Sequence, residues 1–277
     1  MTRPTITLLT DFGARDPSAG ILHGVIAALA PEARIIDISH EVRKFAIRDG
    51  ALLLWCALPY MPIGFHVGVV DPGVGTARRP IAVAARRGDV LIGPDNGLLM
   101  AAADRLGGID AGWVLESLEY RLSDVSSSFH GRDIFAPAAA HLANGVEPRS
   151  LGPALDPVSL VKSPIADPIV EHGLLRSSSI YVDTFGNVKL AGLRQDLEAA
   201  LGPLNSGDPL QLGLEATDGA SSNPLAVTWR STFGEVRPGE LLLYEDSYGR
   251  LCLARNMGNA AQSLALIEDR PMTIRRA

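Results

Sequence analysis

The sequence predicts two domains of different fold class: an α/β N-terminal domain with a mostly parallel sheet, and a smaller all-β, barrel-like C-terminal domain. Three observations predict this division. Strand-like and helix-like segments alternate up to about residue 151, prolines then gather, and short strand-like segments follow with little helix. We therefore expect an α/β domain over residues 1–163, a linker at about 152–168, and a β-barrel domain over residues 169–277.

In the first domain, short β-rich runs predict strands, and apolar residues at helical spacing predict helices. Pro31 and Pro59 follow the first two helical stretches and end them. Because strands and helices alternate over short connections, a mostly parallel sheet is expected. The expected strands are 6–10, 34–39, 66–70, 81–85 and 90–94, and the expected helices are 19–30, 46–58, 97–106 and 132–144.

In the second domain, short strands alternate with Gly, Pro, Asn and Asp turns. Their regular spacing favours a small barrel or sandwich. Only residues 193–201 have a helical pattern. The expected strands are 178–183, 185–192, 209–214, 225–229, 240–246, 250–256 and 272–276.

Composition and charge narrow the range of partners and compartments. The chain has 277 residues, 47% of them hydrophobic, and a net charge of −6, so it can bury a core and is not expected to bind nucleic acid or an anionic membrane. No apolar run approaches the ~20 residues of a membrane span. The two cysteines, Cys56 and Cys252, lie far apart in apolar surroundings. A reducing, cytoplasmic location is therefore expected.

Polar residues gather where predicted strands end, which is where ligands bind in open α/β sheets. Asp11 and Asp16 follow the first strand in TDFGARD. Two acids in a glycine-containing loop are able to hold a sugar diol and an amine, or a metal. The simpler interpretation, favoured by these residues alone, is a turn with Asp16 capping the next helix.

The stretch VVDPGVGTARR (Val69–Arg79) places Asp71 after an apolar strand and Arg78 beyond a glycine turn. It lacks both the P-loop and the dinucleotide-binding patterns. A glycine loop is usually only a turn, but an acid and a base on its two sides are able to form a charge-assisted pair.

The stretch SSSFHGRDIFAPAAAH places His130 in a glycine-flanked loop before an Ala-rich helix. A loop histidine is a better functional candidate than His141, which is expected to pack within the helix. Arg132 and Asp133 are expected either to cap the helix or to pair with each other. One His among scattered acids is weak support for metal-dependent hydrolysis.

Taken together, the ordered motifs resemble one family. TDFG..D, IIDISHEV, VVDPGVGT.R, GPDNGLL, S.FHGRDIFAPAAAHLA.G, D.FGN and N.GNAA occur in that order from Thr10 to about Ala261. The sequence is similar to the S-adenosyl-L-methionine hydroxide adenosyltransferases, relatives of the fluorinating and chlorinating enzymes. The resemblance implies an α/β domain, a β-barrel, and a homotrimer whose sites lie between the N-terminal domain of one subunit and the C-terminal domain of the next.

The resemblance also implies a reaction: water or hydroxide attacks C5′ of the ribose and displaces L-methionine, leaving adenosine. The sulfonium leaves as a neutral thioether, so no metal or cofactor is expected. By resemblance, Asp71, Arg78 and His130 position the attacking water, and Arg78 favours its hydroxide form.

Two other functions remain open. The first is a halogenase-type transferase acting on the same substrate, and the second is a non-catalytic module that binds S-adenosyl-L-methionine or adenosine. In halogenating relatives a Tyr stands at the position of Asp71, and the residue at the position of His130 is not His. Fluorinating relatives also carry a long insertion that this chain lacks. These differences favour water as the nucleophile.

The resemblance also implies substrate contacts. Asp11 matches the residue that holds the ribose hydroxyls, and Asp16 the one that pairs with the methionine ammonium. Asn187 matches an adenine-edge contact, and Ser247 a contact to the methionine carboxylate. Further expected contacts are Phe45 beside the ribose, Phe129 and Phe185 near the base or the reacting carbon, and Arg255, Asn256 and Met257 around the adenine.

Overall fold

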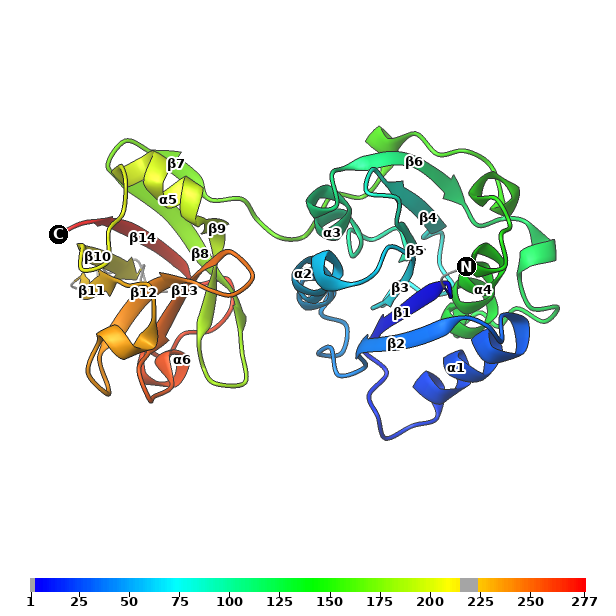
Figure 1. Cartoon of the computed structure of the whole chain (residues 1–277), viewed down its shortest axis with the longest axis horizontal. Coiled ribbons are helices and arrows are strands. Elements are labelled where there is room, and N and C mark those ends of the chain that lie inside the picture. The colour runs from blue at the N-terminus through cyan, green and yellow to red at the C-terminus, as the bar shows by residue number, and fades with distance from the viewer. Residues whose placement is uncertain (1–2, 215–223) are drawn as a thin grey trace. The chain divides into compact units, whose positions relative to one another are not determined.

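The computed structural model describes residues 3–214 and 224–277 of the chain. These form two compact units, Met1–Pro164 and Ile165–Ala277 (Figure 1). Each unit has its own hydrophobic core.

The first unit is built on a six-stranded sheet in the order β2-β1-β3-β5-β4-β6. Strand β1 runs parallel to β2 and β3, and β3 runs parallel to β5, whereas β4 is antiparallel to both of its neighbours. The predicted mostly parallel sheet is therefore confirmed. The strands are β1 (Thr5–Thr10), β2 (Arg34–Ser39), β3 (Phe65–Val69), β4 (Pro80–Ala85), β5 (Val90–Pro94) and β6 (Ile109–Val114).

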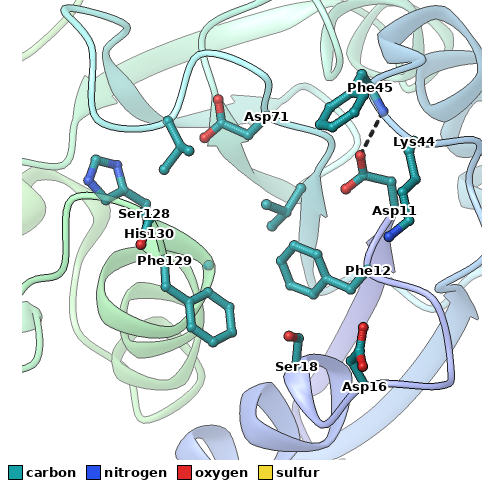
Figure 2. Close-up of a pocket in the computed structure, with 13 residues that line it drawn as sticks. Asp11, Phe12, Asp16, Ser18, Lys44, Phe45, Asp71, Ser128, Phe129 and His130 are labelled. Atoms are coloured by element: carbon teal, nitrogen blue, oxygen red, sulfur yellow. Dashed lines mark hydrogen bonds between the residues drawn. The ribbon is translucent and has the colours of Figure 1, made fainter.

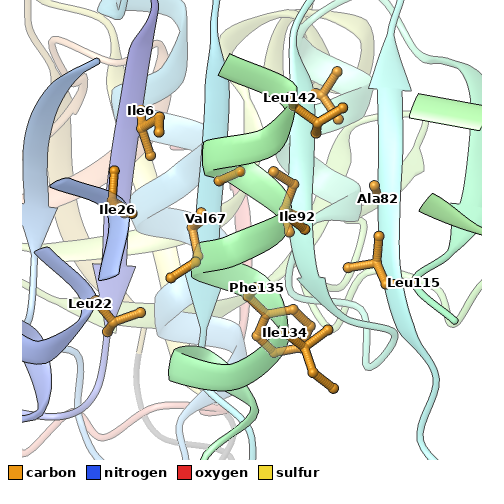
Figure 3. Packing of buried hydrophobic residues seen from close by; sticks show 14 of the residues in the cluster. Ile6, Leu22, Ile26, Val67, Ala82, Ile92, Leu115, Ile134, Phe135 and Leu142 are labelled. Carbon is orange, nitrogen blue, oxygen red and sulfur yellow. The ribbon is translucent and has the colours of Figure 1, made fainter. Parts of the chain in front are cut away.

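Helices cover both faces of this sheet (Figure 1). Helix α1 (Ser18–Leu29) packs with α4 (Ala136–Ala143), and α2 (Ile47–Ala57) packs with α3 (Met100–Arg105). Alternating side chains of β1, such as Ile6 and Leu8, meet Leu22 and Ile26 of α1 in one core (Figure 3). Burying these aliphatic side chains supplies the main driving force for packing helix on sheet.

Three details of this unit differ from the sequence prediction. Strand β6 was not predicted, because Asp110 and Gly112 interrupt its apolar pattern. The expected helix at 132–144 begins instead with a π-helical turn, η3 (Gly131–Phe135), and the helix expected from residue 97 begins at Met100. Short 3₁₀ turns are η1 (Leu58–Tyr60), η2 (Leu118–Tyr120), η4 (Pro148–Leu151) and η5 (Pro157–Ser159).

A buried polar network ties β1, β3 and β5 together. His66 contacts Thr7 Oγ1 through Nδ1 at 2.9 Å and Asp89 Oδ1 through Nε2 at 2.8 Å. Arg87 donates to both oxygens of Asp89. Burial alone would raise the pKa of Asp89, but the hydrogen bonds from His66 and Arg87 outweigh it and hold that pKa well below its usual value.

The second unit is a closed β-barrel. Its strands follow the order β14-β10-β11-β12-β13-β9-β8-β7, and β14 also pairs with β8, which closes seven of the described strands into a barrel. The predicted barrel-like domain is therefore confirmed. Its strands are β7 (Ile169–Glu171), β8 (Leu174–Val182), β9 (Val188–Leu193), β10 (Pro209–Leu214), β11 (Leu225–Trp229), β12 (Leu241–Glu245), β13 (Arg250–Arg255) and β14 (Pro271–Arg276).

The barrel encloses aliphatic side chains from most of its strands, among them Leu190, Leu212, Leu243, Leu253 and Ile274. Outside the strands lie α5 (Arg194–Leu201), the 3₁₀ turn η6 (Phe233–Glu235) and α6 (Ala260–Ser263). The predicted strand at 185–192 begins only at Val188, because residues before it form a turn. Within the described residues, none of the helices has the length and apolarity that crossing a bilayer requires.

Candidate functional site

A pocket of about 290 Å³ lies at the edge of the first sheet where β1 and β3 end (Figure 2). These two strands are parallel neighbours, so the residues that follow them, Asp11 and Asp71, reach the same edge. The pocket brings together six residues predicted from the sequence as site residues: Asp11, Asp16, Phe45, Asp71, Phe129 and His130.

The seventh predicted residue of this unit, Arg78, joins Asp71 to His130. Its Nε donates to Asp71 Oδ1 at 3.1 Å, and its Nη2 donates to Asp71 Oδ2 and lies 3.1 Å from His130 Nδ1. The side chains of Arg78 and Asp71 are only 7% and 5% exposed. A buried, forked ion pair of this kind fixes both partners, and here it also fixes the imidazole.

This environment favours the neutral form of His130. Burial is the largest cause and lowers the pKa of His130, and the positive charge of Arg78 lowers it further, while Asp71 opposes both. Because an arginine has only donors, its contact with Nδ1 requires Nδ1 to be the acceptor. The neutral ring then carries its proton on Nε2.

Two further motifs hold these loops in place. In PDNG, Asp95 accepts a hydrogen bond from Arg79 at 2.8 Å, and Asn96 donates to the carbonyl of Val70 at 2.9 Å. In FHGRD, Asp133 pairs with Arg132 and accepts from the backbone N–H of Ser126 at 2.8 Å. The sequence left capping or pairing open for Arg132 and Asp133, and pairing is what the structure shows.

Asp11 is oriented by a strained neighbour. The N–H of Phe45 donates to Asp11 Oδ2 at 2.9 Å, and Phe45 has a φ of 66°, which is uncommon for a bulky residue. The ring of Phe45 is 69% exposed. The strained backbone of Phe45 therefore places the Asp11 carboxylate and the Phe45 ring beside the pocket.

Asp16 does not cap the following helix, so that simpler interpretation is wrong. Helix α1 has Pro17 as its N-cap residue, with no side-chain capping bond. Asp16 instead lines the pocket with Ser18. The rings of Phe12 and Phe129 meet edge to face at 5.6 Å and form an apolar part of the wall.

A second, larger pocket of about 940 Å³ lies in the barrel unit. The six remaining predicted residues all line it: Phe185, Asn187, Ser247, Arg255, Asn256 and Met257. Phe185 and Met257 are 78% and 87% exposed, and Met257 has a φ of 53°. Each unit therefore gathers its own share of the predicted site residues.

Hydrogen bonds within the second pocket limit what each side chain has left for a ligand. Asn187 Nδ2 donates to Asp183 Oδ2 at 2.9 Å, which leaves its amide oxygen and second N–H. Arg255 donates to Ser263 Oγ, and Asn256 donates to the carbonyl of Val236. Arg255 and Asn256 thus hold loops in place as well as lining the pocket.

Sequence reasoning missed several lining residues. Phe12 and Lys44 stand beside predicted site residues in the chain, and that adjacency was the signal that would have found them. Lys189, Phe233 and Tyr244 line the second pocket from the barrel strands and η6, and no local motif marks them.

Asp11, Asp16, Asp71 and His130 line the first pocket. Across the described residues, its acids and its histidine do not form a three-ligand group. The group that does converge, His23, Asp37 and His40, lies elsewhere in the first unit.

Fold and pockets together define a two-domain protein with a small acidic pocket in an α/β unit and a larger pocket in a β-barrel. The family follows from the sequence. The profile of the SAM hydroxide adenosyltransferase N-terminal domain matches residues 6–152, and that of the C-terminal domain matches residues 178–273. The chain belongs to this family.

Similar proteins cover almost the whole chain. An (R)-S-adenosyl-L-methionine hydrolase of Salinispora tropica is 44% identical, over 95% of this chain and 94% of its own length. A Thermus thermophilus protein of the same name is 36% identical, over 97% of this chain and 98% of its own length. A fluorinase of Actinoplanes sp. is more distant, with 26% identity over 99% of this chain and 98% of its own length.

Among solved structures, an uncharacterized conserved protein from Thermotoga maritima matches with a TM-score of 0.88 and 33% identity. The match covers 98% of this chain and all of that one.

Replacing Gly75 tests how tightly the two loops of the first pocket are packed. Gly75 has a φ of 76°, and a Cβ there would lie 2.3 Å from the carbonyl oxygen of Ser127. Gly75→Ala must therefore push the loop that carries His130 away from Arg78. Because burial and Arg78 both lower the pKa of His130, we expect that pKa to rise, as measured by NMR titration of the imidazole.

Gly145→Ala is the matched control. Gly145 has a φ of 91°, but a Cβ added there would meet no atom within 4 Å, so this variant bears backbone strain alone. An unchanged His130 titration in a folded Gly75→Ala protein would contradict the tight packing.

Proposed function

We propose that this chain hydrolyses S-adenosyl-L-methionine to adenosine and L-methionine. Water or hydroxide attacks C5′ of the ribose, the new C5′–O bond forms as the C5′–S bond breaks, and the sulfur keeps the electron pair as a neutral thioether. One proton is released. The observation that carries this proposal is the joining of Asp71, Arg78 and His130 at a pocket that Asp11 and Asp16 also line.

In this proposal the three residues prepare the nucleophile. The positive charge of Arg78 lowers the pKa of a nearby water and so favours hydroxide. Asp71 keeps lone pairs beyond those taken by Arg78, and these accept a proton from the water. The Nε2–H of His130 donates to the attacking oxygen. These residues would accelerate the reaction by holding that oxygen in line with the C5′–S bond, and no covalent intermediate is needed.

The first pocket would bind the ribose and methionine portions. Asp11 uses one oxygen for the Phe45 N–H and offers its remaining lone pairs to the ribose diol. Asp16 pairs with the ammonium group. Phe45 and Phe129 cover the ribose and the reacting carbon.

The second pocket would bind the adenine and the methionine carboxylate. The Asn187 amide, held by Asp183, accepts from the adenine amino group and donates to a ring nitrogen. Phe185 and Met257 are exposed apolar side chains that a bound base would cover. Ser247 contacts the carboxylate, and backbone groups of Arg255 and Asn256 lie beside the adenine.

Product analysis tests the reaction. Incubating the purified chain with (R)-S-adenosyl-L-methionine should give adenosine and methionine in equal amounts, and added chloride should give no 5′-chloro product on chromatography. His130→Ala and Arg78→Ala should lower kcat by roughly 100-fold or more with a smaller change in KM. Arg86→Ala, an exposed arginine at the β4–β5 turn, is the control.

Each other outcome selects another function. A 5′-halo product would identify a halogenase-type transferase, and substrate left intact with measurable binding would identify a binding module. Normal turnover in both the Arg78 and His130 variants would refute the proposed roles.

The pH profile tests the state of His130. The Arg78 bond requires a neutral ring, so kcat/KM should fall as pH falls through the pKa of His130 in the free enzyme. Because that pKa is lowered, the midpoint should lie below the ordinary value of about 6.5 and activity should be flat above it. His130→Gln should abolish this acid limb in the residual activity. A midpoint at or above the ordinary value would contradict the assignment.

We also propose that the two pockets are halves of one site, contributed by neighbouring subunits of a homotrimer. The first pocket, at about 290 Å³, is at the lower end of the ~300–1,000 Å³ of ligand sites and lacks the adenine-binding residues.

A cytoplasmic location also belongs to this proposal. It is supported by the buried thiols of Cys56 and Cys252, and cell fractionation would test it.

Subunit mixing tests the shared site. His130→Ala and Asn187→Ala each damage one pocket, and both should be nearly inactive alone. Trimers reassembled from an equal mixture should regain roughly one quarter of wild-type activity. At about one quarter of the interfaces, a first pocket with intact His130 meets a second pocket with intact Asn187. No recovery in verified mixed trimers would place the whole site within one chain.

A further inference from the structure

Three potential metal ligands meet in the first unit, outside the pocket. His23 lies on α1, Asp37 on β2, and His40 just after β2. Asp37 Oδ1 is 2.8 Å from His23 Nε2 and 3.0 Å from His40 Nε2. One ligand atom from each residue lies within 4.8 Å of the other two. None of the three lines the first pocket.

The donor set selects a class of ion. Two imidazoles and one carboxylate suit Zn²⁺ and its neighbours among the divalent transition metals, whereas Mg²⁺ and Ca²⁺ prefer oxygen ligands. Tetrahedral Zn²⁺ with bonds of about 2.0–2.1 Å separates its ligands by about 3.3 Å. The two nitrogen–oxygen distances here need to widen by only a few tenths of an ångström. Asp37 is 43% exposed and His23 is 38% exposed, so both side chains are able to adjust.

His40 is already held in the orientation of a ligand. Its side chain is 12% exposed, and its Nδ1 lies 2.9 Å from the hydroxyl of buried Thr10. Metal-bound histidines usually donate their other ring N–H to such a partner. The Thr10 oxygen also accepts from the Phe12 N–H at 3.2 Å, and it has two lone pairs for these two donors.

The remaining nitrogen of His40 lacks the bond that an ordinary structural histidine would make. His40 Nε2 is buried and, within residues 3–214 and 224–277, makes no hydrogen bond, although Asp37 Oδ1 is close. A buried polar atom without a hydrogen bond costs free energy unless something else satisfies it. Two imidazole nitrogens thus converge on one carboxylate oxygen, and only one of them forms a hydrogen bond with it.

We propose that His23, Asp37 and His40 form a three-ligand site for Zn²⁺ or a similar divalent transition metal, with the fourth position open to water. The ion would tie α1 to β2. It takes no part in the proposed hydrolysis, and the proposal does not depend on that reaction. Its structural effect is to hold α1, whose first residue Ser18 lines the pocket, against the sheet.

Zinc binding to the tag-free, full-length protein tests the site. Isothermal titration of the chelator-treated protein should show one Zn²⁺ per chain, and Mg²⁺ or Ca²⁺ should not compete. Co²⁺ in place of Zn²⁺ should give the intense visible absorption of a tetrahedral site. His23→Ala and Asp37→Asn should each weaken Zn²⁺ binding by at least about 100-fold, since even losing an outer partner of a ligand costs about 10–100-fold.

A matched control and a second readout keep the test decisive. His172→Ala removes an exposed imidazole from the barrel unit and should leave Zn²⁺ binding unchanged. Zn²⁺ should raise the Tm of the wild type and of His172→Ala but not of His23→Gln, a change at a partly exposed helix position. Zinc affinity unaffected by the His23 and Asp37 changes, or no zinc binding by the folded wild type, would overturn the proposal.

Discussion

The buried pairing of Arg78 with Asp71 is the interaction on which the geometry of the first pocket depends. Taking two charges out of water costs several kcal/mol for each, and only close pairing with further hydrogen bonds offsets that cost. The loop between these residues must therefore close on itself. His130, from a segment far along the chain, is then fixed by the same guanidinium. The ion pair therefore fixes the position of the imidazole, and burial together with the charge of Arg78 favours its neutral form.

The same pairing suits the proposed chemistry. A sulfonium leaves as a neutral thioether, so the protein has to supply a placed oxygen and a nearby positive charge rather than a strong acid. The first unit holds that arrangement rigidly at the sheet edge, since Asp95, Asn96 and Asp133 each anchor a loop beside it. The barrel unit carries the residues proposed to recognise the base. In this proposal the first unit carries the reacting group and the ribose contacts, and the barrel unit carries the contacts to the base.

Local sequence patterns predicted the sheet, the barrel and the strand-end position of Asp11 and Asp71, because periodicity and turn residues act within short segments. The resemblance, rather than composition, supplied the residue roles. Features set by distant contacts were not predictable. Phe45 takes a positive φ where its N–H meets Asp11, and His23 meets Asp37 only after α1 packs on the sheet. The capping role expected of Asp16 failed because Pro17 occupies that position.

In the proposed reaction, a water oxygen held by the Asp71–Arg78–His130 group attacks C5′ of the ribose. The most direct measurement is mass spectrometry of the products of a single turnover in ¹⁸O-labelled water. We expect the label in the 5′-hydroxyl of adenosine and none in methionine. Unlabelled adenosine, or label in an amino-acid product instead, would contradict the claim, because the attacking atom or the attacked carbon would then be a different one.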